Sequence, residues 1–215
     1  MDEVLKKPSG VIRLPAILIS YIFHPVFIPL YAIAFLVFVH PGYFAGFSLQ
    51  SKYQTLLITA LNTLFFPLLS IGLLKALGFI QSVFLRTQKD RIIPYIACGI
   101  FYFWTFTVFK EQSSFDPVLS SFMLGVFLAS SAALIANIYF KVSMHAIGMG
   151  GWLGLFIIIS NSNSMLMTWP LSILMLITGL VCSARLFLTD HTQKDIYSGL
   201  ATGLLTQWVA AMVMM

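Results

Sequence analysis

Long apolar stretches separated by short polar connections dominate the chain, and most charged residues lie in those connections or at the ends of the stretches. A helix needs about 20 apolar residues to cross the hydrocarbon core of a bilayer. Because lipid offers no partners for backbone N–H and C=O groups, a segment that crosses it has to satisfy them internally, as a helix does. The sequence therefore predicts an all-α, polytopic bundle of six to seven transmembrane helices. The seven candidate spans are 14–39, 53–77, 92–109, 117–140, 145–160, 168–188 and 196–214.

The composition agrees with a membrane protein, since 59% of the residues are apolar and only 9% are charged. Soluble domains carry about 25% charged residues. No polar stretch is long enough for a separate soluble domain, so residues 1–215 are predicted to form one integral membrane domain. No basic run is interleaved with aromatic residues, which argues against a nucleic-acid partner. We expect a multi-pass protein of the plasma (inner) membrane.

Two of the seven stretches differ from the others. The first contains Pro15, Pro25 and Pro29, so its helix is predicted to be kinked or broken. The fifth is short, which predicts little tilt or a partly re-entrant segment. His24 and His40 each precede a proline, and we interpret them as a helix kink and the start of a loop.

Two pairs of glycines are spaced four residues apart, Gly150 with Gly154 and Gly199 with Gly203. Small residues at this spacing let helices approach closely in lipid. The pairs therefore predict helix packing and not chemistry.

Ionisable residues near or inside the spans gather in three clusters. Because a charged side chain in a membrane costs free energy, such residues are candidates for a functional role. Two spans lie between the first and second clusters, and two more lie between the second and third. An even number of crossings returns the chain to the same membrane face, so all three clusters are predicted to meet on one side. The clusters are Arg86, Lys89, Asp90 and Arg91; Lys141 and His145; and Arg185, Asp190, His191, Lys194 and Asp195.

Together the three clusters offer the groups needed to bind and transfer a phosphoryl group. Arginine and lysine side chains match phosphate oxygens well. His145 opens a predicted helix behind Ser143, so backbone N–H groups and the helix dipole point at whatever lies there. Asp195 follows His191 by four residues, on the same helical face, where a carboxylate fixes the tautomer of the imidazole. Few carboxylates remain to hold Mg²⁺, so neither a metal nor another cofactor is expected.

The third cluster resembles the third motif of the type 2 phosphatidic acid phosphatase (PAP2) superfamily, S-R-x5-H-x3-D, through Arg185, His191 and Asp195. Ser143 and His145 resemble the second motif, P-S-G-H, and residues 86–94 loosely resemble the first, K-x6-R-P. The resemblance covers roughly the second half to two-thirds of the chain, and it implies a PAP2-like helical core.

The chain departs from the family pattern in every motif. The departures are Ala184 for Ser in the third, Val142 and Met144 for Pro and Gly in the second, and, in the first, Arg86 for Lys and Ile93 for Arg, with Pro94 at the Pro position. Lys89 or Arg91 is expected to supply the charge that the first motif lacks.

The resemblance implies a role for each matching residue. His191 attacks phosphorus and forms a phosphohistidine, Asp195 orients His191, and His145 protonates the leaving oxygen. Water then releases phosphate. The oxygens of the transition state are held by the remaining residues: Arg185, Ser143, Arg91, Lys89, Arg86 and Lys141.

These roles describe a membrane lipid phosphatase that cleaves a lipid phosphate monoester or diphosphate without a metal ion, among membrane lipids. A lipid phosphotransferase, in which an alcohol accepts the phosphoryl group, fits the same residues. A catalytically silent relative that binds lipid head groups or assists assembly is a third reading, which the departures in the first and second motifs favour. The positive-inside rule places the clusters on the cytoplasmic side, whereas many relatives act on the outer face.

Overall fold

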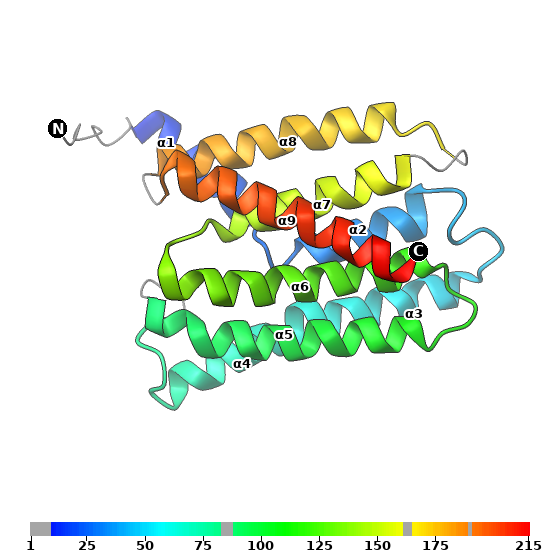
Figure 1. Cartoon of the computed structure of the whole chain (residues 1–215), viewed down its shortest axis with the longest axis horizontal. Coiled ribbons are helices and arrows are strands. Elements are labelled where there is room, and N and C mark those ends of the chain that lie inside the picture. The colour runs from blue at the N-terminus through cyan, green and yellow to red at the C-terminus, as the bar shows by residue number, and fades with distance from the viewer. Residues whose placement is uncertain (1–9, 83–87, 161–164, 189–190) are drawn as a thin grey trace.

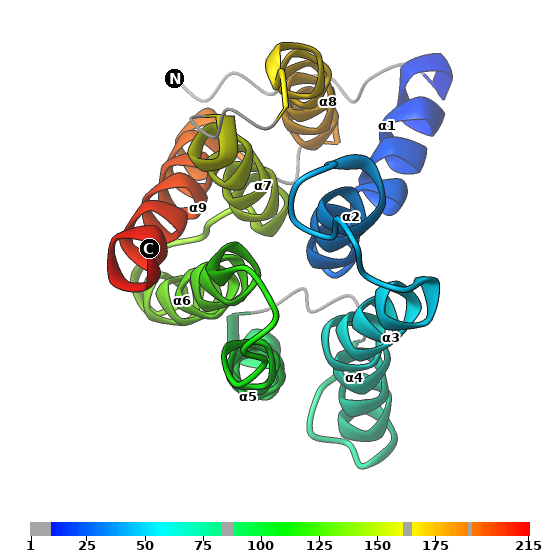
Figure 2. The same ribbon diagram turned by 90° about the vertical axis from the view of Figure 1, so that its right-hand side faces the viewer.

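The computed structural model describes residues 10–82, 88–160, 165–188 and 191–215, and every element in these ranges is helical. Most of the rods run along the long axis of the molecule (Figure 1). Seen from one end, they surround α2, which lies between α7, α6 and α3 (Figure 2). The elements are α1 (Gly10–Ile22), α2 (Ile28–Ala34), η1 (Phe35–Val39), α3 (Leu49–Ala60), η2 (Leu61–Phe65), α4 (Phe66–Ala76), α5 (Gln88–Lys110), α6 (Pro117–Tyr139), α7 (Met144–Ser160), α8 (Thr168–Phe187) and α9 (Gln193–Met214).

Five of these helices are long and apolar enough to cross a membrane, which confirms the all-α class and a chain with several candidate spans. One of them is continuous across α3, η2 and α4, where η2 is a π-helical turn. The five are Leu49–Ala76, Gln88–Lys110, Pro117–Tyr139, Thr168–Phe187 and Gln193–Met214.

The first apolar stretch is broken, as its prolines predict. Helix α1 ends at Ile22, residues 23–27 form turns, and α2 begins at Ile28 with Pro29 in its first turn. Pro25 lies in the break, where its missing N–H costs no helical hydrogen bond. Neither half is long enough to cross a bilayer alone, so the stretch is not one of the five long spans.

The fifth stretch forms α7, whose 17 residues extend about 25 Å. It is apolar but shorter than the five candidate spans. Its first turn begins inside the bundle and is joined to the end of α6 by an oblique connection (Figure 1). The expectation of six to seven full spans therefore rests on these two interrupted or short segments.

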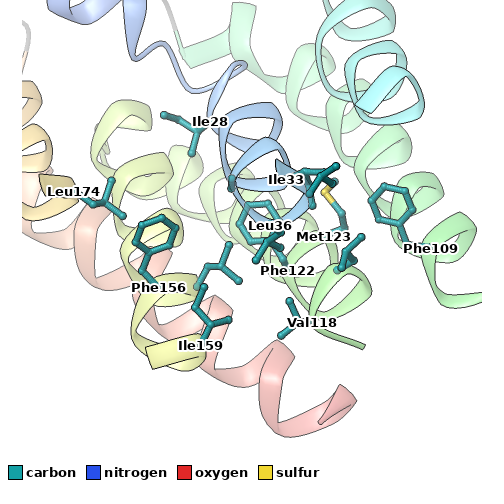
Figure 3. Packing of buried hydrophobic residues seen from close by; sticks show 14 of the residues in the cluster. Ile28, Ile33, Leu36, Phe109, Val118, Phe122, Met123, Phe156, Ile159 and Leu174 are labelled. Atoms are coloured by element: carbon teal, nitrogen blue, oxygen red, sulfur yellow. The ribbon is translucent and has the colours of Figure 1, made fainter. Parts of the chain in front are cut away.

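The apolar core lies around α2 and η1 (Figure 3). Ile33 and Leu36 are fully buried there against Phe122 of α6 and Phe156 of α7. Phe109, close to the end of α5, closes the same cluster.

Helices α7 and α9 cross at their glycines, as the spacing of these residues predicts. A Cβ atom on Gly150 would collide with the backbone carbonyl of Leu200, and one on Gly203 would collide with the carbonyl of Ile147. At these two positions the backbone of one helix touches the backbone of the other directly, while Gly154 faces the side chain of Gln207 and Gly199 faces that of Ala146. This contact sets the distance between the starts of α7 and α9, which carry His145 and Asp195.

Candidate functional site

The described members of the three clusters lie at one end of the bundle, as the even number of crossings predicts, whereas Asp190 of the third cluster lies outside the residues that the structure describes. This end holds the start of α5, the end of α6, the start of α7, the end of α8 and the start of α9 (Figure 1). The charges of Arg91, Lys141 and Arg185, one from each cluster, all act on His191. The charge of His191 in turn acts on His145, so the two histidines belong to the same electrostatic site.

His191 occupies the connection between α8 and α9, and only 7% of its side chain is exposed. Its Nδ1 lies 3.5 Å from Oδ2 of Asp195, a contact longer than a full hydrogen bond. The pairing is the one predicted from the spacing of four residues. Since Nδ1 faces the carboxylate, Nε2 is the nitrogen left for chemistry.

Asp195 also builds the start of α9. Its Oδ2 accepts a hydrogen bond from the backbone N–H of Thr192 at 2.9 Å, and Oγ1 of Thr192 accepts one from the N–H of Asp195 at 3.3 Å. This reciprocal pair is a capping box, which satisfies two N–H groups that the helix start would otherwise leave unpaired. This role was not among the predictions from the sequence, although Thr192-x-x-Asp195 before an apolar run is its usual signature.

The electrostatic environment of His191 favours the neutral imidazole. Burial, and after it the positive charges of Arg185, Lys141 and Arg91, together lower the pKa of His191 to about 4, against the opposing effect of Asp195. A neutral imidazole is the nucleophilic form. The same cations that keep it neutral would attract an anionic substrate to it.

His145 is the second residue of α7 and is buried. Its Nε2 lies 3.0 Å from the backbone carbonyl of Ser20 in α1. Since a carbonyl only accepts, the Nε2 atom carries the proton and the neutral ring keeps Nδ1 bare. The sequence indicated no partner for His145, because this one comes from a segment more than 120 residues away.

His24 lies in the same site, although its position before Pro25 predicts only a helix kink. Its ring meets that of His145 edge to face, with the centroids 5.4 Å apart and the planes at 84°. The charge of Arg185 acts on both rings. In the sequence, His24 is marked only by the proline that follows it. This proline predicts a break in the helix but does not indicate which residues the break contacts.

Ser143 is fully buried and joins α7 to α9. Its N–H donates to the carbonyl of Asp195 at 3.2 Å, and its Oγ accepts a longer hydrogen bond, 3.4 Å, from the N–H of Ala146. The hydroxyl proton can still donate to a phosphate oxygen. The predicted role of Ser143 in phosphate binding therefore stays a prediction beside an observed role in capping α7.

The two residues that depart from the second motif are packed into the protein. Val142 is buried in a small cluster with Tyr95 and Ile147. The sulfur of Met144 accepts a hydrogen bond from the hydroxyl of Tyr95 at 2.8 Å. These contacts tie the turn before His145 to α5.

The cations of the first motif are placed differently from one another. Arg91, in the first turn of α5, acts on His191. Lys89 is exposed, and the described charges that act on His191 do not include it. Arg86 lies outside the residues that the structure describes. The prediction that Lys89 or Arg91 supplies the missing positive charge is thus supported by the position of Arg91 alone.

Asp90, which the sequence groups with these cations, is turned toward the preceding connection. Its Oδ1 accepts a hydrogen bond from the N–H of Gln81 at 3.2 Å. Its carboxylate therefore ties the start of α5 to Gln81, shortly after the end of α4.

A large apolar cavity of about 650 Å³ lies next to the site, between η2 and α4 on one side and α5 and α6 on the other. Tyr95, Gly99 and Phe103 line it along one face of α5. Arg91 precedes Tyr95 by one helical turn, on the same face. The cavity therefore begins one turn away from a cation of the site.

Compared with protein-family models, with curated proteins and with solved structures, the chain matches none of them. The chemistry of the site therefore has to be understood from its own residues.

Proposed function

We propose that the protein is a membrane lipid phosphatase that cleaves a phosphate monoester or diphosphate through a phosphohistidine on His191. The observation that carries the proposal is the environment of this one side chain. A buried imidazole has a carboxylate near one ring nitrogen, and three cations act on it, two from separate helices and one from the connection between α6 and α7. The PAP2-like pattern of Arg185, His191 and Asp195 supports the same chemistry.

The reaction proceeds in two steps. The scheme starts with His145 in its charged form, the ring having taken up a second proton as the anionic phosphate enters the site. Nε2 of His191 attacks phosphorus, the bond from phosphorus to the lipid oxygen breaks, and that oxygen takes this second proton from His145. A water molecule then attacks the phosphohistidine and gives a proton back to His145. The phosphorus–nitrogen bond breaks, and inorganic phosphate leaves while His191 regains its neutral form.

Cationic side chains perform the electrostatic task in this scheme. The charge of the transferring group spreads over its outer oxygens, and in the proposed scheme Arg185, Lys141 and Arg91, whose charges act on His191, stabilise those oxygens. Among the described residues, no group of three or more His, Cys, Asp or Glu side chains is arranged to hold a metal ion. We therefore propose that turnover does not require a divalent cation.

The apolar cavity supports a lipid as the substrate. A phosphate bound near Arg91 would leave its hydrocarbon chain beside Tyr95, where the cavity starts. The walls of the cavity then continue along α5 through Gly99 and Phe103. A soluble phosphate ester would gain nothing from this apolar surface.

The test is release of phosphate from a panel of lipid phosphates and diphosphates in detergent, with a chelator present, together with trapping of an acid-labile phosphoenzyme. We expect turnover by the parent chain. His191→Asn should abolish both turnover and the phosphoenzyme. His145→Asn should slow turnover and still allow the phosphoenzyme to form.

His40→Asn is a matched control, because His40 is also buried and its Nδ1 accepts a hydrogen bond from the N–H of Gly42 at 3.2 Å, which an Asn side chain can replace. This variant should keep its activity. A folded parent chain that turns over none of the lipid phosphates would refute the proposal and favour a protein that only binds head groups. Transfer of the phosphoryl group to an added alcohol in preference to water would identify a phosphotransferase.

A further inference from the structure

The break in the first apolar stretch lies against the start of α7, and this neighbourhood is more specific than a kink requires. Helix α1 packs along α8, the helix that carries Arg185. At the break, the last turns of α1 and the residues before α2 meet His145 through two contacts of different kinds. One is polar and one is aromatic.

The polar contact determines which nitrogen of His145 exchanges a proton. The carbonyl of Ser20 holds the Nε2–H of His145 at 3.0 Å. That proton is retained in the neutral and in the charged ring, since the carbonyl offers only acceptor sites. The proton that His145 gives to a leaving oxygen therefore has to come from Nδ1.

The aromatic contact limits rotation of the same ring. His24 meets His145 edge to face at 5.4 Å, an arrangement that aromatic pairs prefer. His24 is itself held by the turn, because its Nδ1 accepts the N–H of Val26 at 3.4 Å and its carbonyl accepts the N–H of Phe27 at 2.9 Å. A ring fixed on one edge by a carbonyl and on another side by a second ring has little freedom left.

We propose that His24 is a positioning residue for His145, and that it acts with the Ser20 carbonyl to direct Nδ1 of His145 at the leaving oxygen. The inference rests on the proposed phosphatase function. It assigns a part of the site to α1 and the turn after it, which contribute no residue to the PAP2-like motifs. The break between α1 and α2 lets the Ser20 carbonyl and the His24 ring contact the same side chain, that of His145.

The experiment compares two substrates that differ in their need for the proton. A lipid phosphate has an alkoxide leaving group and depends on His145, whereas an aryl phosphate such as 4-nitrophenyl phosphate has a stable leaving group and depends on it much less. His24→Asn and His24→Ala both remove the ring, and the Asn variant keeps an acceptor for the N–H of Val26. His24→Phe keeps a ring.

We expect loss of the ring to reduce kcat on the lipid phosphate by at least about tenfold, a fraction of the factor that general acid catalysis contributes. On the aryl phosphate the reduction should be less than about threefold. His24→Phe should restore most of the activity on the lipid phosphate. In a chain that already carries His145→Ala, replacing His24 should cause no further loss.

An equal loss on both substrates, or losses that multiply in the double variant, would overturn the inference and leave His24 a structural residue. Thermal unfolding of each variant in detergent separates a folding defect from a catalytic one, and either ring-deleting variant that folds is sufficient for the comparison. Absence of turnover by the parent chain would refute the proposed function itself. Activity of the parent with no difference between substrates would refute only the role of His24.

Discussion

The carboxylate of Asp195 serves two groups through one oxygen, Oδ2, which accepts the N–H of Thr192 and faces Nδ1 of His191. The capping interaction holds the carboxylate in place whether or not His191 is charged. In this way the start of α9 pre-orients the partner of the proposed nucleophile. The arrangement requires no additional residue to support Asp195.

Replacing Asp195 by Asn should separate the two roles. The Asn oxygen can still accept the N–H of Thr192, but its amide would then donate to Nδ1 of His191 and force the ring proton onto Nε2. We expect a loss of activity of about 10² to 10⁴, since the wrong tautomer has no lone pair for attack. The free energy of unfolding should change by no more than about 1 kcal/mol. Activity assays with thermal unfolding test this, and near-normal activity would contradict the pairing.

The ionisation of His191 can be measured without substrate. Diethyl pyrocarbonate acylates only a neutral imidazole, and peptide mass spectrometry resolves each histidine. Because the pKa of His191 is lowered to about 4, we expect its modification to persist as the pH falls and to be half lost near pH 4. An ordinary histidine would lose half its reactivity near pH 6.5.

Two variants should move this midpoint in opposite directions. Lys141→Gln removes a cation that opposes protonation, so the pKa of His191 should rise. Asp195→Asn removes the anion that favours protonation, so the pKa should fall. A midpoint near 6.5 in the parent chain, or a shift of both variants in the same direction, would show that these charges do not act on His191 as described.

At the residue scale, the sequence was most informative where groups lie close along the chain. The spacing of four residues between His191 and Asp195 predicts their pairing, and the two side chains lie 3.5 Å apart. The sequence was least informative about the residues that surround His145. Ser20 and His24 reach this residue only because α1 ends where it does, and no local pattern encodes that meeting.

The elements that set the geometry of the site are α7 and α9, which touch through their backbones. Gly203→Ala places a Cβ against the carbonyl of Ile147 and the N–H of Gly151, neither of which can rotate away. We expect destabilisation of about 1–3 kcal/mol, as for other overpacked interiors. The starts of the two helices should separate, so activity should fall as well.

Gly179→Ala on α8 is the matched control for that variant, since a Cβ there meets nothing within 4 Å. It should leave stability unchanged or raise it by up to about 1 kcal/mol through helix propensity. Thermal unfolding of both variants in the same detergent is the measurement. Equal stability of the two variants would show that α7 and α9 have room between them.

The cavity beside α5 gives a prediction about chain length in the substrate. At Gly99 a Cβ would make only ordinary contacts, at 4.0 Å from Phe127 and Ser130, so Gly99→Leu can be accommodated and its side chain fills part of the cavity. We expect KM to rise several-fold for a long-chain lipid phosphate and to stay unchanged for a short-chain one. Gly72→Leu on α4, where a Cβ meets nothing within 4 Å, should alter neither.

At the scale of elements, apolar periods and prolines predict the helices well. The long helices fall where the sequence places them, and the first stretch breaks at Pro25 as expected. The continuity of α3 and α4 through a π-helical turn has no comparable signal, because the extra residue in η2 changes neither composition nor hydropathy. Sequence patterns therefore predict which segments are helical, but they predict poorly where a helix contains an irregular turn.

For the whole molecule, the site defines one end of the bundle and the loops after η1 and α5 define the other. Cysteines introduced at Gln81 and Lys194 should therefore react with an impermeant maleimide from the same side of a sealed vesicle. Cysteines at Gln50 and Glu111 should react only from the opposite side. Cys98 and Cys182 are both free thiols and have to be replaced first.

Reaction of residues 81 and 194 from opposite sides would contradict a single site built from three clusters. The parity of the crossings allowed the sequence to predict this common end before any distances were known. It could not predict how deep the site lies, because depth depends on where each helix starts relative to its neighbours.

The length of α7 determines how deep the site lies relative to the membrane surface. A hydrocarbon layer of about 30 Å is thicker than the roughly 25 Å that α7 extends, whereas the 23 residues of α6 extend about 35 Å. We therefore expect His145, at the start of this short helix, to lie below the plane in which lipid head groups rest. Either the leaflet thins beside α7 or a lipid sinks to reach the histidines, and both events become easier in a thin bilayer. The thickness of the surrounding membrane would then control how often a lipid head group reaches the site. It would act as substrate concentration does for a soluble enzyme.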